Sequence, residues 1–193
     1  MIMQAAEPRV LRWTREEYYR IAELGFFRGR RVELIEGDII EMSPQDAPHA
    51  AAIRLIDYTM KRVFQEGFLV CVQLPLSLGS DSEPEPDLAV VKGTLRDYHR
   101  SHPDTAVLVI EVAGSSLEYD RTRKASVYAE AGIQDYWIVD LVSRKVEVLR
   151  KPLRHSKGPI AFGYGEHTPY APGQSITPLA LPGVAVPVAE ILI

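Results

Sequence analysis

Residues 106–113 read Ala-Val-Leu-Val-Ile-Glu-Val-Ala, an apolar run that contains a single carboxylate, Glu111. A short apolar run without polar alternation is typical of a strand that is covered on both faces of a sheet. A carboxylate in such a strand must be paired, protonated or bound to a metal, because an isolated buried charge is very costly. Glu111 is therefore the first candidate for a functional residue.

Further strand and helix patterns lie on both sides of this run. Upstream, residues 68–78 and 87–91 have the composition of strands, and a proline-rich acidic turn separates them. Downstream, a helical pattern over 119–131 is followed by two strand patterns at 135–140 and 145–149. This order predicts an α/β (α+β mixed) fold, a mixed β-sheet flanked by helices.

The N-terminal part adds a helix and a hairpin to this core. Thr14 and Glu17 form a capping box for a helix that we expect to end at Gly25. Residues 31–42 have the pattern of a β-hairpin with a Glu-Gly-Asp turn. From 49 to 66, apolar residues recur three and four positions apart, which predicts an amphipathic helix that ends before Gly67.

The length and composition favour one domain over residues 1–193. With 193 residues, 46% of them hydrophobic, the chain can fill one core, which we place at about 31–150. Residues 151–193 are rich in proline and glycine, so we expect short strands and turns there that cap the same core.

The single cysteine and the absence of long apolar segments indicate the compartment. Cys71 lies in an apolar stretch, where a buried thiol is expected and no intrachain disulfide can form. Residues 1–10 lack a basic segment followed by an apolar run, and no stretch approaches the roughly 20 residues of a membrane span. We therefore expect a cytoplasmic protein without membrane contact.

The formal charge of -4 argues mildly against binding nucleic acid through bulk charge, but it permits a local basic groove.

Asp87 is the second candidate. It directly precedes the apolar run Leu-Ala-Val-Val, on a strand that we expect to lie near the strand of Glu111. Two carboxylates that converge at a sheet edge, with water and phosphate oxygens, suit Mg²⁺ or Mn²⁺. The alternative is a solvated turn carboxylate beside Glu83 and Glu85.

Lys124 is the third candidate. It lies four residues after Asp120 on the predicted helix, so both side chains point to one face. The short turn after Glu111 brings the helix start over the strand end, where an amine could orient or deprotonate an attacking water. The alternatives are a structural ion pair between Glu111 and Lys124, or a bond from Lys124 to Asp120.

These residues belong to a series of spaced motifs between Trp13 and Leu149. The series resembles the Uma-two type of putative restriction endonucleases, a branch of the PD-(D/E)XK nuclease superfamily. The motifs are Glu33-Leu34-Ile35-Glu36-Gly37, His49, Pro86-Asp87, Glu111-Val112-Ala113, Asp120 with Lys124 and Tyr128, Gly132-Ile133 and Tyr136-Trp137-Ile138-Val139-Asp140.

The resemblance implies a restriction-endonuclease-like core and metal-dependent hydrolysis of phosphodiester bonds. Asp87 and Glu111 would then hold the metal, with the Val112 carbonyl as a further oxygen ligand. The superfamily usually has lysine two residues after the glutamate; this chain has Ala113, so that role passes to Lys124.

The same resemblance makes Glu33 an accessory acid and brings His49 near the site. The alternatives are a surface strand residue for Glu33 and a helix-start or packing histidine for His49. Tyr136 and Trp137 are expected to be core and edge aromatics.

The leading hypothesis is a Mg²⁺- or Mn²⁺-dependent endonuclease that cuts DNA, with Lys124 positioning the attacking water. A homodimer would help such an enzyme to cut both strands, and the hairpin over 32–40 or the late strands could pair two copies. The second hypothesis is a catalytically inactive nuclease-fold protein that binds nucleic acid or a protein partner. Hydrolysis of RNA or of another phosphate ester stays open.

Overall fold

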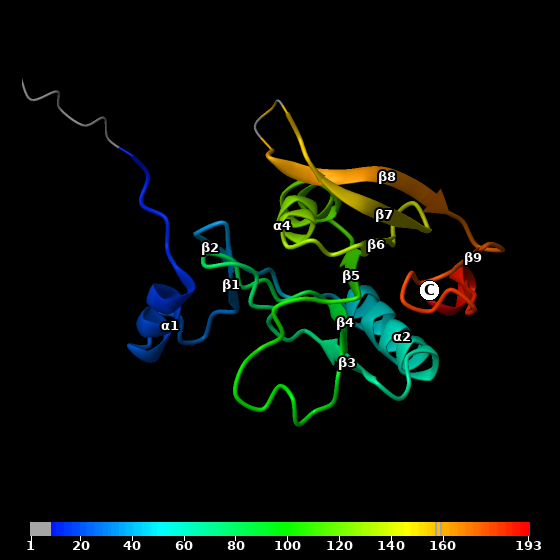
Figure 1. Cartoon of the computed structure of the whole chain (residues 1–193), viewed down its shortest axis with the longest axis horizontal. Helices are drawn as coiled ribbons and strands as arrows, with labels where there is room; N and C mark the ends of the chain where they lie inside the picture. The colour runs from blue at the N-terminus through cyan, green and yellow to red at the C-terminus, as the bar shows by residue number, and fades with distance from the viewer. Residues whose placement is uncertain (1–8, 157, 159) are drawn as a thin grey trace, which may run out of the picture.

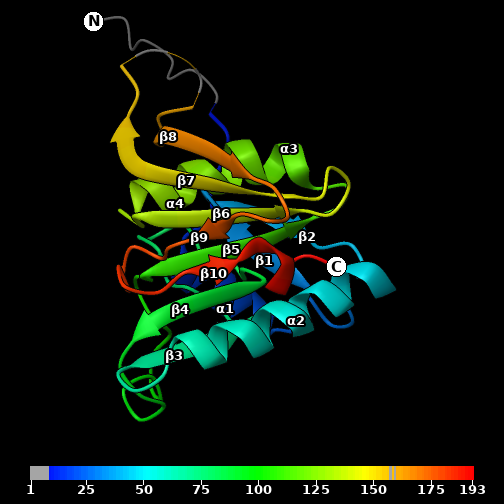
Figure 2. The same cartoon turned by 90° about the vertical axis from the view of Figure 1, so that its right-hand side faces the viewer.

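The computed structural model of the chain describes residues 9–156, 158 and 160–193. The sequence predicts no targeting segment in residues 1–10, and residues 1–8 of that stretch lie outside the described residues. A six-stranded sheet with the strand order β3-β4-β5-β6-β7-β8 forms the centre (Figures 1 and 2). Its strands are β3 (Phe68–Val72), β4 (Leu88–Lys92), β5 (Leu108–Ala113), β6 (Asp135–Asp140), β7 (Lys145–Arg154) and β8 (Phe162–Tyr170).

The sheet is mixed, as predicted. The β5 and β6 strands are parallel, and every other neighbouring pair is antiparallel. A parallel pair needs a crossover connection, usually a helix. Here the crossover consists of α3 (Leu117–Tyr119), the π-helical segment η1 (Asp120–Lys124) and α4 (Ala125–Glu130).

The two faces of the sheet are covered by different parts of the chain (Figure 1). Residues Leu108, Ile110 and Val112 of β5 belong to the core with α2 (Ala47–Val63). The C-terminal elements join this core: β9 (Ser175–Ile176), β10 (Val186–Pro187) and the 3₁₀ turn η2 (Val188–Glu190). Because side chains alternate along a strand, Glu111 points to the opposite face, where α4 packs.

The N-terminal helix α1 (Arg15–Glu23) and the hairpin of β1 (Val32–Ile35) and β2 (Asp38–Glu41) lie beside the sheet (Figure 1). The predicted capping box of Thr14 and Glu17 is present. The hairpin turn has positive φ at Glu36 (50°) and Gly37 (76°), as expected for a tight two-residue turn of type I′. The α1 residue Tyr18 packs with β1, and a single β-bridge joins Leu34 to Glu83.

Several predicted boundaries were wrong. The strand predicted over 145–149 continues to Arg154 as β7. The predicted helix over 49–66 begins earlier, because Asp46 caps it at Ala47, and it ends at Val63, since Phe64 leaves the helical conformation. The strand predicted over 68–78 ends at Val72, and Gln73 has a positive φ of 51° that turns the chain away.

The C-terminal part also differs from the prediction. The expected short strands are present as β9 and β10, but β8 is a nine-residue strand that pairs with β7 at the edge of the main sheet. Glycine and proline are tolerated there because an edge strand leaves one row of backbone groups unpaired.

Two smaller predictions concern burial. Cys71 is a buried free thiol, as predicted. Tyr136 and Trp137 were predicted to be core and edge aromatics, but both are fully buried on β6, an interior strand of the sheet, so neither lies at an edge. In the described part of the chain, no helix is both long and apolar enough to cross a membrane.

Candidate active site

The predicted site residues meet in one cavity of about 560 Å³. The cavity lies where the hairpin, the start of α2, the adjoining ends of β4 and β5 and the crossover helix come together. Its lining includes Glu33, His49, Asp87, Glu111, Asp120 and Lys124. Residues from five regions of the sequence therefore share one site.

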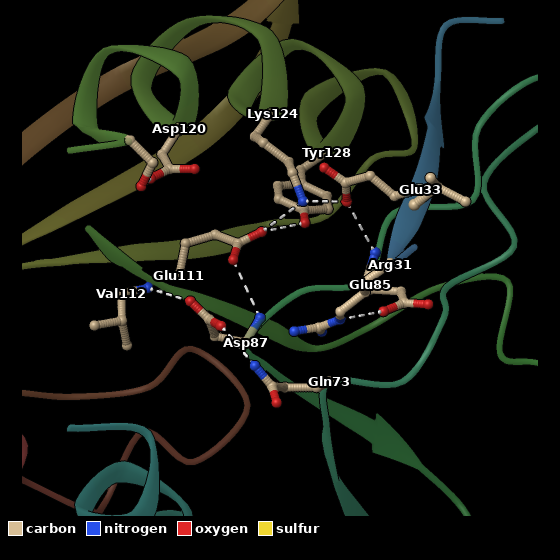
Figure 3. Close-up of polar contacts among 12 residues, drawn as sticks. Arg31, Glu33, Gln73, Glu85, Asp87, Glu111, Val112, Asp120, Lys124 and Tyr128 are labelled. Carbon is tan, nitrogen blue, oxygen red and sulfur yellow. Dashed lines mark hydrogen bonds and ion pairs between the residues drawn. The ribbon is translucent and has the colours of Figure 1, made fainter. Parts of the chain in front are cut away.

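Asp87 and Glu111 are linked through the backbone of each other's strand. The Asp87 N–H donates to Glu111 Oε2 at 3.1 Å, and the Val112 N–H donates to Asp87 Oδ2 at 2.9 Å. Asp87 is 7% exposed and Glu111 5% exposed, so Asp87 is not a solvated turn carboxylate. The predicted convergence of the two carboxylates is present (Figure 3).

Lys124 lies between two carboxylates (Figure 3). Its Nζ donates to Glu33 Oε2 at 2.7 Å and to Glu111 Oε1 at 3.2 Å. The alternative bond from Lys124 to Asp120 is not formed among these contacts, whereas the ion pair with Glu111 is. Burial favours a lower pKa for Lys124, but the charges of Glu111 and Glu33 outweigh it and raise the pKa, so this side chain is an ammonium.

Glu33 is a buried residue of the site. It is 2% exposed, so the alternative of a surface strand residue was wrong. Besides Lys124, its Oε2 accepts the backbone N–H of Glu85 at 3.1 Å. The hairpin is thus part of the site, although it lies outside the main sheet.

His49 approaches the site as the resemblance implied, and it also lies in the first turn of α2. Its Nε2 is 3.2 Å from Asp87 Oδ1, the atom that also accepts Gln73 Nε2 at 3.2 Å. The hydrogen bond to Asp87 raises the pKa of His49, while burial opposes the shift. Asp87 is therefore fixed from three directions: β5, α2 and the turn after β3.

Two contacts of the site were missed by sequence reasoning. The Tyr128 hydroxyl donates to Glu111 Oε1 at 2.6 Å. Its position four residues after Lys124 on a helix was a usable signal, because such residues share a face. Gln73 gave no signal in the sequence, since its side chain reaches Asp87 through a backbone turn with positive φ after β3.

Burial has a strong effect on the acidic groups here. Burial raises the pKa of Glu111, and the nearby Lys124 charge opposes the shift. Burial likewise raises the pKa of Asp120, whose Oδ2 accepts the Ser116 hydroxyl at 2.7 Å. These shifts arise because negative charge is crowded into a space with little water.

The donor set fits a hard divalent cation. Among the described residues that line the cavity, the carboxylates of Glu33, Asp87, Glu111 and Asp120 are buried, while Lys124 is the one buried ammonium. This excess of negative charge favours a bound cation, and oxygen ligands suit Mg²⁺ or Mn²⁺. Across the described residues, no three His, Cys, Asp or Glu side chains cluster closely enough to bind one ion among themselves. Water and substrate oxygens would have to complete the coordination, as is usual for Mg²⁺.

The sequence matches the Uma2 family, described as "Putative restriction endonuclease", over residues 15–189. The chain belongs to the Uma2 family. The resemblance inferred from the spaced motifs is thereby confirmed, and the match extends beyond Leu149 through the C-terminal elements.

A solved structure supports the same fold. The chain is similar to the crystal structure of a putative nuclease belonging to DUF820 from Anabaena variabilis ATCC 29413. The TM-score is 0.70 at 16% sequence identity, and the alignment covers 93% of this chain and 97% of that one. The nuclease-like fold predicted from the sequence is therefore confirmed. A search of curated proteins found no match.

Proposed function

We propose that this Uma2 chain is a metal-dependent endonuclease that hydrolyses phosphodiester bonds in DNA. The observation that carries the proposal is the linked pair of Asp87 and Glu111, buried in one cavity beside the Lys124 ammonium. Membership of a family described as "Putative restriction endonuclease" supports the same reaction class. The membership does not by itself identify the catalytic residues.

The roles of the side chains follow from their contacts. Asp87 and Glu111 would hold the Mg²⁺ or Mn²⁺ ion, and the Val112 carbonyl is proposed as a further oxygen ligand. The ion, when bound, supplies positive charge to the scissile phosphate and lowers the pKa of a coordinated water.

Lys124 has a positioning and electrostatic role in this proposal. Because its pKa is raised, it is suited to hold a water or a phosphate oxygen by donating hydrogen bonds, not to remove a proton. Glu33 would fix the direction of the ammonium through their 2.7 Å contact. This is the accessory role that we propose for Glu33.

The decisive experiment compares Asp87→Ala with Asp104→Ala on supercoiled DNA and on RNA in Mg²⁺ or Mn²⁺. Asp104 is an exposed carboxylate outside the cavity, so its removal is the matched control. We expect cleavage of DNA by the wild type and by Asp104→Ala, and a loss of at least about 100-fold in Asp87→Ala. Excess chelator should abolish the activity.

Cleavage that persists in chelator, or in Asp87→Ala, would refute the proposed site. The second hypothesis, an inactive nuclease-fold protein, predicts DNA or protein binding that is indifferent to Mg²⁺ and to substitution of Glu111. Its support is Ala113, which stands where the superfamily usually has its lysine. A homodimer stays a prediction, to be checked by the mass of the protein in solution with and without DNA.

A further inference from the structure

Asp120 is a buried carboxylate of the cavity to which neither the sequence argument nor the family description gives a role. It is 4% exposed and lies in the π-helical segment that also carries Lys124. Within the described part of the chain, Oδ2 accepts the Ser116 hydroxyl, and Oδ1 has no hydrogen-bond partner. Lys124, the buried cation at the other end of the same segment, pairs with Glu33 and Glu111 instead.

The placement of Asp120 points toward the reacting centre. Figure 3 shows Asp120 and Lys124 extending from the same helix toward the strand that carries Glu111. π-Helical turns are rare and are found frequently at functional sites. Here the π-helical turn begins at the carboxylate and ends at the ammonium, and both residues line the cavity.

A second unsatisfied group lies next to it. The Tyr119 hydroxyl is buried without a partner among the described residues, and Tyr119 lines the same cavity. Buried polar groups are nearly always hydrogen-bonded, often to ordered water. The Tyr119 hydroxyl and Asp120 Oδ1, both in residues that line the cavity, are groups suited to hold water or a substrate oxygen.

We propose that Asp120 is a further catalytic residue, whose Oδ1 accepts a hydrogen bond from the attacking water and takes up its proton. The water O–H bond breaks as the water oxygen bonds to phosphorus, and the proton passes to the carboxylate. The bond from phosphorus to the leaving oxygen then breaks, and that oxygen takes a proton from solvent. The inference rests on the proposed function and assigns the proton acceptor that the Lys124 ammonium does not provide.

In this proposal Asp120 acts through water and not as a direct metal ligand. Among the described residues, Asp120 does not form a three-residue cluster of acidic or histidine side chains with Asp87 and Glu111. A carboxylate one water molecule away from an ion still raises the affinity for that ion by its charge and by orienting the bound water. Loss of such a partner typically costs about 10- to 100-fold in metal affinity or activity.

The test uses Asp120→Asn with Glu118→Gln as the matched control, since Glu118 is an exposed acid in the same crossover helix. Two quantities are measured on the full chain: the Mn²⁺ dissociation constant by calorimetry, and the DNA cleavage rate at saturating Mn²⁺. We expect Asp120→Asn to weaken Mn²⁺ binding about 10-fold and to slow cleavage about 100-fold or more. DNA binding in Ca²⁺ should stay unchanged, and Glu118→Gln should match the wild type in every measurement.

Two further variants separate folding from chemistry. Ser116→Ala removes the hydroxyl partner of Asp120 but keeps the carboxylate, so Mn²⁺ binding should be close to that of the wild type. Asp120→Glu retains the charge and should retain Mn²⁺ binding even where cleavage is slower. Both are informative if Asp120→Asn does not fold.

The possible results distinguish this inference from the proposed function. If the wild type binds Mn²⁺ and Asp87→Ala does not, while Asp120→Asn binds the ion and cleaves DNA as Glu118→Gln does, Asp120 has no catalytic role and the proposed function stands. If the wild type binds Mn²⁺ without cutting DNA, an unchanged affinity in Asp120→Asn still overturns the inference. If the wild type binds no divalent ion, both fail together.

Discussion

At the scale of single residues, the charge of Lys124 decides what the site can do. Its Nζ contacts one carboxylate from the hairpin and one from the central strand, and the residue is 3% exposed. Buried ions are stable only when paired, and removal of one partner leaves the other uncompensated. Lys124 is thus both a structural counter-ion and a candidate for contact with substrate.

The first prediction concerns the coupling of Glu33 and Lys124. Lys124→Met should lower the free energy of unfolding in chelator by about 3–5 kcal/mol, because two buried carboxylates lose their counter-ion. The double variant with Glu33→Gln should lose less than the sum of the single variants, with a coupling energy of about 1–3 kcal/mol. Urea unfolding measures the free energy of unfolding of the wild type, the two single variants and the double variant.

The exposed pair of Lys61 and Asp57 provides the control for this cycle. Lys61→Met should change stability by less than about 1 kcal/mol, as is usual for a surface ion pair. Additive effects of the Glu33 and Lys124 substitutions would contradict the contact.

The same residues indicate how far sequence reasoning reaches at a site. Asp87, Glu111 and Lys124 could be predicted because each stands out from its own local pattern, as a charge beside a strand or on a helix face. Glu33 was predicted only through the family resemblance, because no local pattern marks it: its partner Lys124 is 91 positions away, and the residues around it have the pattern of an ordinary hairpin. His49 and Gln73 contact Asp87 through tertiary packing that no local pattern records.

At the scale of elements, the π-helical segment η1 is held from two sides. Arg121 donates to Glu147 of β7, and Arg123 pairs with Glu36 and Asp38 of the hairpin and donates to the Ile35 carbonyl. Asp120 and Lys124 lie at the two ends of the same segment and line the cavity. The arginines therefore fix the position of the segment that carries two site residues.

The second prediction concerns the pH dependence of this anchoring. Burial alone would raise the pKa of Glu147, but hydrogen bonds from Arg121 and Lys145 lower it to about 2 from the model-compound value of 4.5. A folded-state pKa below the unfolded one means that this stabilisation is present above about pH 4.5 and is lost as the pH falls toward 2. Glu147→Gln should therefore be less stable than the wild type at pH 7, and the difference should shrink between pH 4.5 and 2.

Thermal unfolding of both proteins across this pH range measures the effect. Glu190→Gln is the control, because the Glu190 carboxylate forms an exposed pair with Arg62 at the surface. A stability difference between the wild type and Glu147→Gln that is constant with pH would contradict the lowered pKa.

Element boundaries were less predictable than element types. The order of helices and strands follows from apolar periodicity, whereas the end of β3 depends on the backbone of Gln73 and the start of α2 on the cap by Asp46. The π-helical turn has no sequence signal of its own, since its hydrogen bonds depend on how the crossover packs. The length of β8 was missed because its glycine and proline residues are unusual in strands. Pairing with β7 stabilises it as an edge strand.

At the scale of the whole molecule, metal binding should increase the free energy of unfolding. A ligand that binds only the folded state stabilises it by about 2.7 kcal/mol at 100 times its Kd. For a chain of this size, that corresponds to an increase in Tm of about 5–10 °C.

The third prediction is therefore a Tm shift that depends on Asp87. Mg²⁺ or Mn²⁺ should raise the Tm of the wild type and of Asp104→Ala, but not that of Asp87→Ala, as measured by calorimetry. A wild type whose Tm does not respond to either ion at millimolar concentration would contradict the metal site.

The docking of the hairpin against the crossover helix has a consequence for how the activity arises during synthesis. The hairpin is synthesised before the crossover, so Glu33 cannot pair with Lys124 until about 90 more residues have been added. A shorter fragment that begins after Glu41 contains every strand of the main sheet, yet it lacks the acid that orients Lys124. Under the proposed function, the arrangement of Lys124 between Glu33 and Glu111 is therefore completed only after two distant parts of the polypeptide have docked.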